Sequence, residues 1–400
     1  MSLPSTISRV LQRTMSAIGT PLWLGVAHSV WRRGTEGDGT WVISGHRGRA
    51  YLDNSAALEE FARASGQSIT WIANAPLDAE LAERGVRTLR RNSWAARRAI
   101  SRASALIYSH GEDDLDLFMI LLRGRTAPRF YLNHSNNFLK AGGVLEPDWE
   151  EQWWLRRLFR GWLLTDCDHL LASSKKEKEN FARSYPNLAD KIVMGGGAHL
   201  DSWERALRGT PRRRIYWFPT FRDSATGAAM LRQAVRDVVT SERLSAWLEA
   251  NDYEFFVGAH INSQSDIADA IRPPFHVAPR ADLVRDISQS EIFISDYSGI
   301  IFDFLLSERP QILFAFDRDD YLKRRCLYVD YPELDFAFHA EDSQALIDAI
   351  VEERWRDDGL REAAARWRQE TLPSRGQDFA GETLQTIDRI LSSEVHSDER

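Results

Sequence analysis

Residues able to bind an anionic group stand together at Ser295-Asp-Tyr-Ser298-Gly299, where hydroxyls, a carboxyl and a glycine follow one another. The apolar run 292–294 predicts a buried strand, and the apolar residues after Gly299 are spaced as on one helix face. Ser298 is suited to cap that helix, and Gly299 permits close approach to the backbone. Unpaired N–H groups at a helix start attract anions, so the stretch predicts a phosphate site, with an ordinary capped helix as the alternative.

Two histidines also follow predicted strands. His134 comes after the strand-like run 130–132, and His260 comes after the run 254–257. An imidazole changes charge near neutral pH, so it can take a proton from a hydroxyl or donate one to a phosphoryl oxygen. A loop histidine with a structural role is the alternative at both positions.

A third polar segment, Pro219-Thr220-Phe-Arg222-Asp223, follows the strand-like run 215–218. The Thr220 hydroxyl and the Arg222 guanidinium suit contact with a phosphate or a nucleotide. The alternative is structural, with Arg222 paired to Asp223 or to another carboxylate in an ordinary turn.

These motifs resemble the CDP-glycerol glycerophosphotransferase family, whose members build teichoic-acid and capsule polysaccharide polymers of the cell envelope. The resemblance rests on Ser295-Asp-Tyr-Ser298, Phe302-Asp-Phe304, Arg309-Pro310 and above all on Pro219-Thr-Phe-Arg222-Asp223. The motifs stand in the family's order and span residues 40–350, so chance similarity does not explain them.

The resemblance implies a set of site residues. His134 would act as the general base, and His260 would stabilise the charge that develops on the donor's diphosphate. Asp303 would hold the ribose hydroxyls of the nucleotide. The expected donor-binding set comprises Ser135, Asn136, Lys140, His199, Pro219, Thr220, Arg222, Gly258, Ser295, Ser298, Gly299 and Asp303.

Departures from the family's pattern concern the substrates. Ser135-Asn136-Asn137 replaces Gly-Thr-Pro after the first histidine, and Lys140 falls one or two positions late. His199 stands where the family has an arginine, and an imidazole is a weaker phosphate partner than a fixed guanidinium. Ile261 replaces the proline after the second histidine. These changes indicate an altered donor or acceptor.

The elements that must position these residues are strands alternating with helical patterns. Strand-like runs occur at 40–44, 69–73, 105–108, 130–132, 169–172, 215–218, 254–257, 292–294 and 311–314. This alternation predicts parallel α/β sheets, and it restarts after the arginine-rich segment 211–214. The fold class expected is α/β of the GT-B type, with two Rossmann-like domains facing a central cleft.

We expect four segments. Residues 1–39 form an N-terminal amphipathic segment, 40–205 an acceptor-side domain, 206–372 a nucleotide-donor domain, and 373–400 a C-terminal helix with a disordered tail. The formal net charge of −7 gives no bulk attraction to nucleic acid. The two cysteines lack metal-ligand spacing, and the motifs hold no acidic Asp-x-Asp cluster, so we expect no metal and no other cofactor.

A membrane surface is an expected partner. No apolar run approaches the ~20 residues that span a bilayer. Several of the 14 tryptophans stand beside arginines, most densely in segment 149–164, and segment 5–31 is amphipathic. Such surfaces suit a membrane interface, whereas a helix packed inside a domain core is the alternative. We expect a cytoplasmic protein, peripheral on the inner face of the membrane.

The function expected is transfer of glycerol phosphate, or a related phosphoalditol, from CDP-glycerol or another CDP-alditol. The acceptor would be a hydroxyl of a lipid-linked or polymeric glycan, and CMP would be released. One alternative is a GT-B glycosyltransferase that uses a nucleotide sugar such as CMP-Kdo. Another is a non-catalytic scaffold of a polymer-synthesis complex.

Overall fold

The computed structural model describes residues 39–116, 127–134, 136–146, 167–220, 222, 224–258, 271–278, 283–374 and 376–398. Ser135, His260, the amphipathic segment 5–31 and the Trp/Arg-rich segment 149–164 lie outside the described residues. What was expected of these positions stays a prediction.

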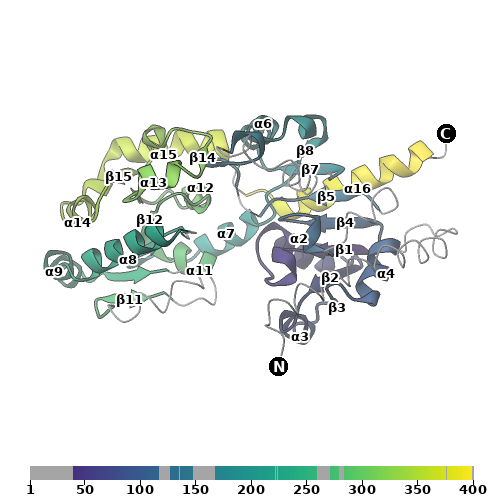
Figure 1. Ribbon diagram of the computed structural model, residues 1–400, viewed down its shortest axis with the longest axis horizontal. Helices are drawn as coiled ribbons and strands as arrows, with labels where there is room; N and C mark the ends of the chain where they lie inside the picture. The colour runs from purple at the N-terminus through teal and green to yellow at the C-terminus, as the bar shows by residue number, and fades with distance from the viewer. Residues whose placement is uncertain are drawn as a thin grey trace, which may run out of the picture. The chain divides into compact units, whose positions relative to one another are not determined.

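The chain divides into two compact units. The colour in Figure 1 gives the residue number along the chain, so each part of a unit can be located there. Among the described residues, the first unit holds those up to Leu132, residues 167–169 and the stretch from Ile387. The second unit holds the described residues between Asn133 and Thr386 apart from those just named. The domain boundaries expected from the sequence stay predictions.

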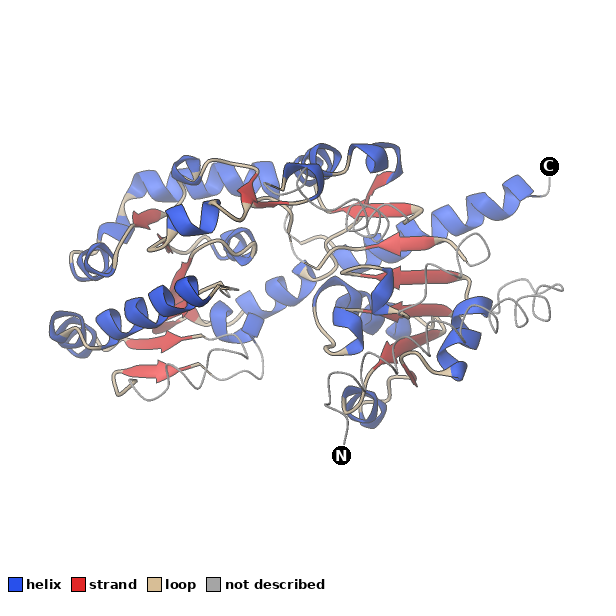
Figure 2. Cartoon of the chain, viewed as in Figure 1, coloured by secondary structure: helices blue, strands red, loops and turns tan. Residues whose placement is uncertain are grey.

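The first sheet has the strand order β3-β2-β1-β4-β5-β7-β8. Its strands are labelled in Figure 1, and Figure 2 draws strands in red and helices in blue. The pairings β1–β2, β1–β4, β2–β3, β4–β5 and β7–β8 are parallel. Strands β1, β2 and β4 are buried along their whole length, as expected where helices cover both faces of a parallel sheet. The bounds are β1 Trp41–Ser44, β2 Ile69–Ala73, β3 Thr88–Arg90, β4 Ala105–Tyr108, β5 Arg129–Tyr131, β7 His169–Ala172 and β8 Ile192–Met194.

The second sheet has the strand order β11-β10-β9-β12-β13-β15, and every neighbouring pair is parallel. Its strands are β9 Arg212–Phe218, β10 Glu254–Val257, β11 Phe275–Val277, β12 Ser290–Ser295, β13 Gln311–Phe314 and β15 Phe338–Ala340. A short antiparallel pair, β6 (Lys140–Ala141) with β14 (Cys326–Leu327), joins two loops of the second unit.

Helices connect the strands of both sheets. They are α2 Asp53–Ala64, α3 Leu77–Glu83, α4 Trp94–Arg102, α6 Lys175–Ser184, α7 Leu200–Leu207, α8 Ala225–Val239, α9 Glu242–Ala250, α11 Leu283–Ser288, α12 Ile300–Asp303, α13 Arg318–Leu322, α14 Ser343–Val351, α15 Asp358–Thr371 and α16 Phe379–Asp398. Short 3-10 helices lie at His46–Gly48 (η1), Glu112–Asp114 (η2), Gly143–Leu145 (η4), Pro186–Lys191 (η5), Phe304–Ser307 (η6), Tyr331–Glu333 (η7) and Arg354–Arg356 (η8). The sequence predicted a disordered tail after residue 391. That prediction is wrong for residues 392–398, because α16 continues to Asp398.

The second sheet separates two apolar clusters because successive strand residues point to opposite faces. Ile215 and Trp217 belong to one cluster with helices α8, α9 and α14, while Tyr216 between them belongs to the other. Phe293 joins Tyr216 in that second cluster, which also contains Ile301 of α12. Helices therefore cover both faces, and the strand ends remain for polar residues. The predicted strands and the α/β class are confirmed.

Candidate active site

The predicted site residues of the second unit follow the carboxyl ends of neighbouring strands. Pro219 and Thr220 follow β9, Gly258 follows β10, and Asp296 follows β12. From β9 the chain passes to β10 and β11 on one side, and then crosses to β12 on the other. In open α/β sheets, ligands bind at such a switch point beyond the carboxyl ends of the strands.

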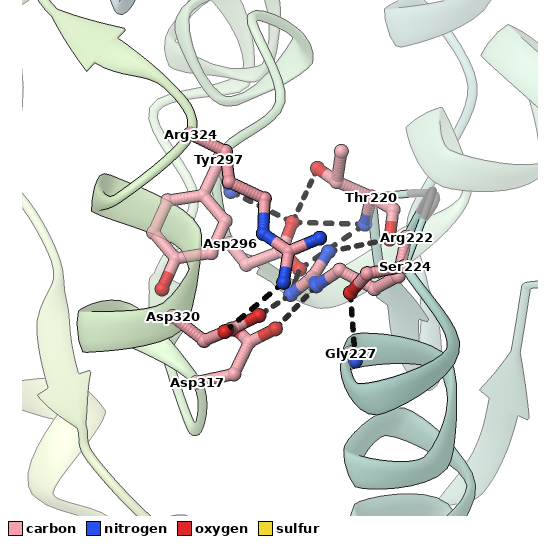
Figure 3. A network of polar contacts seen from close by, with 9 residues as sticks. All are labelled: Thr220, Arg222, Ser224, Gly227, Asp296, Tyr297, Asp317, Asp320 and Arg324. Carbon is pink, nitrogen blue, oxygen red and sulfur yellow. Dashed lines mark hydrogen bonds and ion pairs between the residues drawn. The ribbon is translucent and has the colours of Figure 1, made fainter. Parts of the chain in front are cut away.

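Asp296 is the centre of the polar network at this switch point (Figure 3). Its carboxylate is completely buried and accepts the Thr220 N–H at 2.9 Å and the Thr220 hydroxyl at 2.5 Å. It also accepts the backbone N–H of Tyr297 at 2.7 Å and Nη2 of Arg222 at 2.8 Å. These bonds join the loop after β9 to the loop after β12.

Arg222 is bound on both sides by carboxylates, and its side chain is 4% exposed. Its Nε and Nη2 donate to the two oxygens of Asp317 at 2.5 and 2.9 Å, and the same Nη2 donates to Asp296. Burial alone lowers the pKa of Arg222, but Asp296 and Asp317 outweigh burial and raise this pKa above its ordinary value. The structure thus shows the ion-paired alternative, with Asp296 and Asp317 as the carboxylates, and the guanidinium holds three loops in place.

The turn between β12 and α12 differs in detail from the expected cap. Gly299, with helical φ −59° and ψ −20°, is the residue at the N-cap, and no side chain caps the helix. The Ser298 hydroxyl lies 3.5 Å from the N–H of Ile300, at the limit of a hydrogen bond. The chain is already helical at Gly299, and hydrogen bonds between residues three apart run from Ile301 N to Ser298 O at 3.3 Å and from Phe302 N to Gly299 O at 3.0 Å. The predicted cap by Ser298 is therefore wrong.

Other predicted residues of this region bind the strands to one another. The Ser295 hydroxyl donates to the carbonyl of Phe218 at 2.7 Å, across the β9–β12 pair. A Cβ at Gly258 would lie 2.8 Å from the Phe218 ring, so only glycine permits the close packing of this loop. Pro219 is buried directly after β9.

A second cluster brings together three predicted residues that are far apart in the sequence. The carboxylate of Asp303 accepts Nε2 of His199 at 3.0 Å and the side-chain amide of Asn136 on the same oxygen, Oδ1. All three residues are buried, with exposed fractions of 4% for Asp303, 5% for Asn136 and 9% for His199. The other oxygen of Asp303, Oδ2, makes no hydrogen bond to a residue in the described part of the chain.

The loop that carries Asn136 is held within the second unit by its neighbour Asn137. The buried carboxylate of Glu177 accepts the Asn137 N–H at 3.0 Å, and Asn180 donates to the Asn137 carbonyl at 2.9 Å. The Asn137 side chain donates to the hydroxyl of Tyr328 at 2.9 Å. Asn137, the last residue of the Ser-Asn-Asn segment that replaces Gly-Thr-Pro, therefore supplies hydrogen bonds that position this loop.

The proposed base lies in the same loop. His134 is exposed, and Asn133 before it has a positive φ of 61°. Lys140 is in β6, where it pairs with Leu327 of β14. The roles predicted for these residues stay predictions.

Sequence reasoning missed Asp296, Asp317, Glu177 and Tyr328. Asp296 stood inside the Ser295–Ser298 stretch, and Asp317 comes three residues after β13, so their places at strand ends were readable signals. Glu177 and Tyr328 carry no such signal, because their partners lie in a distant loop.

Among the described residues, no three His, Cys, Asp or Glu side chains are placed to hold a metal ion. No described helix is both long and apolar enough to cross a bilayer.

Comparison with known proteins agrees with these motifs. The model of the family described as CDP-Glycerol:Poly(glycerophosphate) glycerophosphotransferase matches residues 27–375. A teichoic acid poly(ribitol-phosphate) polymerase of Bacillus spizizenii is 35% identical over 206 residues, which cover 46% of this chain and 32% of that protein. A teichoic acid glycerol-phosphate transferase of Staphylococcus aureus is 36% identical over 217 residues, covering 46% of this chain and 50% of that protein. The chain thus spans half or less of the length of these relatives.

Solved structures resemble the chain in fold. The wall teichoic acid polymerase TagF superposes with a TM-score of 0.66 at 16% identity, covering 95% of this chain and 98% of that one. A putative UDP-N-acetylglucosamine 2-epimerase from Listeria monocytogenes gives a TM-score of 0.54 at 13% identity, over 90% and 97% of the two chains. The expected GT-B type of α/β fold is thereby confirmed. Because the family's model covers most of the chain, this protein belongs to the CDP-Glycerol:Poly(glycerophosphate) glycerophosphotransferase family.

Proposed function

We propose that the protein transfers glycerol phosphate, or a related phosphoalditol, from a CDP-activated donor to a hydroxyl of a lipid-linked glycan or cell-surface polymer. The observation that carries the proposal is the family match over residues 27–375. The convergence of Asn136, His199 and Asp303 supports it, since these were expected to share a donor site.

The reaction forms one bond and breaks one. The acceptor oxygen bonds to the β-phosphorus of the donor, the bond from that phosphorus to the oxygen bridging the two phosphates breaks, and CMP leaves. His134 takes the proton of the acceptor hydroxyl, because an unprotonated imidazole nitrogen can act as a general base. His260 and the backbone of the turn at Ser298 and Gly299 stabilise the charge on the diphosphate.

Asp303 binds the ribose of the donor in this proposal. Its Oδ1 is occupied by His199 and Asn136, whereas Oδ2 has no bond to a described residue and can accept a ribose hydroxyl. Thr220 and Arg222 act indirectly, because their polar groups hold Asp296 and thereby fix the turn that meets the diphosphate. Metal-independent catalysis is part of the proposal, and an unchanged rate in excess EDTA is its test.

Phosphorus-31 NMR of the product tests the reaction. Incubation with CDP-glycerol or CDP-ribitol and an acceptor should create a phosphodiester resonance together with CMP. CMP-Kdo should give no product, because it carries no phosphoalditol to transfer. Transfer of its sugar would form a glycosidic bond and no phosphodiester. A glycosidic product from CMP-Kdo would establish the glycosyltransferase alternative, and donor binding without turnover of any donor would establish the scaffold.

We also propose that the protein works in the cytoplasm on the inner face of the membrane. The Trp/Arg-rich segment 149–164 would contact anionic lipid, where each arginine contributes about 1 kcal/mol. Replacing Arg156, Arg157 and Arg160 by glutamate should release the protein from anionic liposomes and leave its melting temperature unchanged. A folding defect without liposome binding by the wild type would instead show that this segment packs inside a domain.

A further inference from the structure

One stretch of the first unit carries positive charge alone. From position 84 to position 111 the sequence contains neither aspartate nor glutamate, although the whole chain has a formal net charge of −7. The stretch holds seven arginines, at positions 84, 87, 90, 91, 97, 98 and 102. Most of them lie in or beside β3, an edge strand of the first sheet, and helix α4, which follows it (Figure 1). The charge of this stretch is therefore opposite to that of the protein as a whole.

Helix α4 buries one side and exposes the other. Ala96 and Ile100 are completely buried. Arg97 donates from Nε to the buried carboxylate of Asp116 at 2.9 Å, so its charge is compensated. Arg98 is exposed and stands two positions after Ala96 and two before Ile100, which places it on the opposite side of the helix from both. Arg98 therefore belongs to the solvent side of α4.

Arg90 is another exposed arginine and lies close to Arg98. Strand β3 ends at Arg90, whose carbonyl accepts the N–H of Ser93 at 3.1 Å, and α4 begins directly after Ser93. One tight turn and little more than one helical turn thus separate Arg90 from Arg98, so their Cα atoms lie within roughly 15 Å of each other. The two guanidinium groups can contact one extended ligand.

The charges of this surface are not compensated within the protein. The guanidinium groups of Arg87, Arg90 and Arg98 make no ion pair or hydrogen bond with any residue that the structure describes, and all three residues are exposed. Each of them has its full set of donors available to a ligand.

Arg91 is half-buried between them and also lacks a carboxylate partner in the described part of the chain. Its Nε donates to the backbone carbonyl of Asp113 at 2.9 Å, while the carboxylate of Asp113 pairs with Arg47. Burial lowers the pKa of Arg91, and the neighbouring carboxylates do not restore it to its ordinary value. An anion beside Arg91 would supply the missing charge.

The arrangement suits an extended polyanion better than a lipid surface. A helix that lies on a membrane turns an apolar side towards the lipid, whereas the apolar residues Ala96 and Ile100 of α4 are buried in the protein. Trp94 is the one large apolar residue of α4 that is exposed, at 49%. The uncompensated arginines instead follow one another from a strand through a turn into a helix. A chain with a phosphate in every repeat matches such a series, because a guanidinium binds phosphate oxygens through paired hydrogen bonds.

We propose that the arginine face, defined as Arg87, Arg90, Arg91 and Arg98, binds the phosphodiester backbone of a polyol phosphate polymer. Such a polymer carries one negative charge per repeat, and each guanidinium would pair with a phosphate oxygen. This inference rests on the proposed function, because it assigns the surface to the polymer that accepts the transferred unit or results from its transfer. It places polymer binding on the first unit, apart from the predicted donor residues of the second unit.

The probe is a synthetic glycerol phosphate hexamer with a fluorescent label at one end. Its control is the same hexamer with methylphosphonate linkages, which have a similar shape and no charge. Fluorescence anisotropy measures hexamer binding by the full chain, and calorimetry measures the affinity for CDP-glycerol. Sedimentation with vesicles of phosphatidylglycerol measures binding to an anionic membrane.

Two double variants alter the arginine face: Arg90→Gln with Arg98→Gln removes two charges, and Arg90→Lys with Arg98→Lys keeps them. The matched control is Arg205→Gln with Arg208→Gln at the end of α7. Arg205 and Arg208 are exposed and make no ion pair with a described residue, so the control changes the net charge by the same amount. Melting curves check that all variants are folded.

The wild type should bind the charged hexamer and not the methylphosphonate form. The glutamine variant of the face should bind the hexamer about tenfold more weakly, since two exposed charge contacts are lost. The lysine variant and the Arg205/Arg208 control should stay within about twofold of the wild type. Hexamer affinity should fall when salt is raised from about 50 to about 200 mM, and less steeply in the glutamine variant. CDP-glycerol affinity and vesicle binding should not change.

Wild-type hexamer affinity in the glutamine variant would overturn the proposal, and so would an equal loss in the Arg205/Arg208 control, which would show an effect of net charge alone. Loss of vesicle binding with unchanged hexamer affinity would assign the face to a membrane and overturn it as well. Failure of the proposed function has a different signature: the wild type would neither bind nor turn over CDP-glycerol, while its hexamer binding would still depend on Arg90 and Arg98.

Discussion

Oδ1 of Asp303 lies 3.0 Å from Nε2 of His199, although 104 positions separate the two residues in the chain. The same oxygen accepts the side-chain amide of Asn136, so one carboxylate oxygen joins three segments of the second unit. Because a carboxylate only accepts, His199 has its proton on Nε2. His199 stands where the family's pattern has an arginine. This chain thus has an imidazole with a fixed tautomer at that position.

Asp303→Ala should weaken binding of CDP-glycerol about tenfold or more and destabilise the fold. The change removes the proposed acceptor of the ribose hydroxyl. It also removes the hydrogen bonds that Asp303 accepts from the buried side chains of His199 and Asn136, at about 1–3 kcal/mol each. Calorimetry and a melting curve measure the two effects. Asp358→Ala, which removes a carboxylate that is 87% exposed, should change neither. Unaltered donor affinity in Asp303→Ala would show that the ribose binds elsewhere.

Arg222→Lys should lower the free energy of unfolding by about 3–5 kcal/mol, the usual effect of breaking a buried ion pair. A lysine has one ammonium group and cannot bridge Asp296 and Asp317 as the planar guanidinium does. Arg243→Lys is the matched control, because Arg243 also pairs with two carboxylates but is 46% exposed. Chemical denaturation should show a large effect only at Arg222; equally small effects at both positions would contradict the positioning role of the network.

His134→Ala should slow transfer by ~10²–10⁴-fold, the usual contribution of a positioned general base. The affinity for CDP-glycerol should stay close to that of the wild type, since the base acts on the acceptor. Single-turnover rates and calorimetry on the same preparation separate the two effects. Transfer at the wild-type rate would remove His134 from the mechanism.

Ser298→Ala should leave the melting temperature unchanged, because its hydroxyl is 3.5 Å from the nearest backbone N–H and does not cap α12. The affinity for a CDP-activated donor should fall by about 1–2 kcal/mol, roughly five- to thirtyfold, through the lost phosphate contact. Ser295→Ala provides a contrast, because its hydroxyl bonds the Phe218 carbonyl and should affect stability more than affinity. If donor affinity is insensitive to Ser298→Ala, this turn does not hold the diphosphate.

Glu177→Gln should reveal a pH-dependent contribution to stability. Burial raises the pKa of the Glu177 carboxyl above its ordinary value, although hydrogen bonds from Ser173 and Asn137 act in the opposite direction. The unfolded chain therefore loses this proton at a lower pH than the folded protein. The stabilisation is fully present below the ordinary pKa and is lost as the pH rises through the folded-state pKa.

The glutamine variant does not titrate, and it lacks the second acceptor oxygen used by Ser173 or Asn137. It should be less stable than the wild type at about pH 4, and the difference should narrow towards about pH 7. Denaturation midpoints at the two pH values measure this. A difference that widens with pH would show that the folded protein lowers the pKa of Glu177.

The sequence by itself determined the central strands of both sheets, the α/β class and the positions of the polar segments, but it did not reveal the short strands β3, β8, β11 and β15. The features that it determined depend on local signals: apolar runs such as 292–294 and 215–218 recur where a strand is buried on both faces, and polar residues follow where the strand leaves the sheet. The motif order also pointed to the family to which the chain belongs. The cap at Ser298 was predicted wrongly, because several tight turns have the same local pattern of serine and glycine.

Only the tertiary structure decided which polar side chains meet. Arg222 was read as a phosphate contact or as one half of an ion pair, and its burial against Asp296 and Asp317 follows from the adjacency of β9, β12 and β13. The meeting of Asp303 with His199 likewise depends on segments that are distant in the sequence. Hydrogen bonds and ion pairs act over a few ångströms of space, and chain packing brings together residues that no local spacing relates.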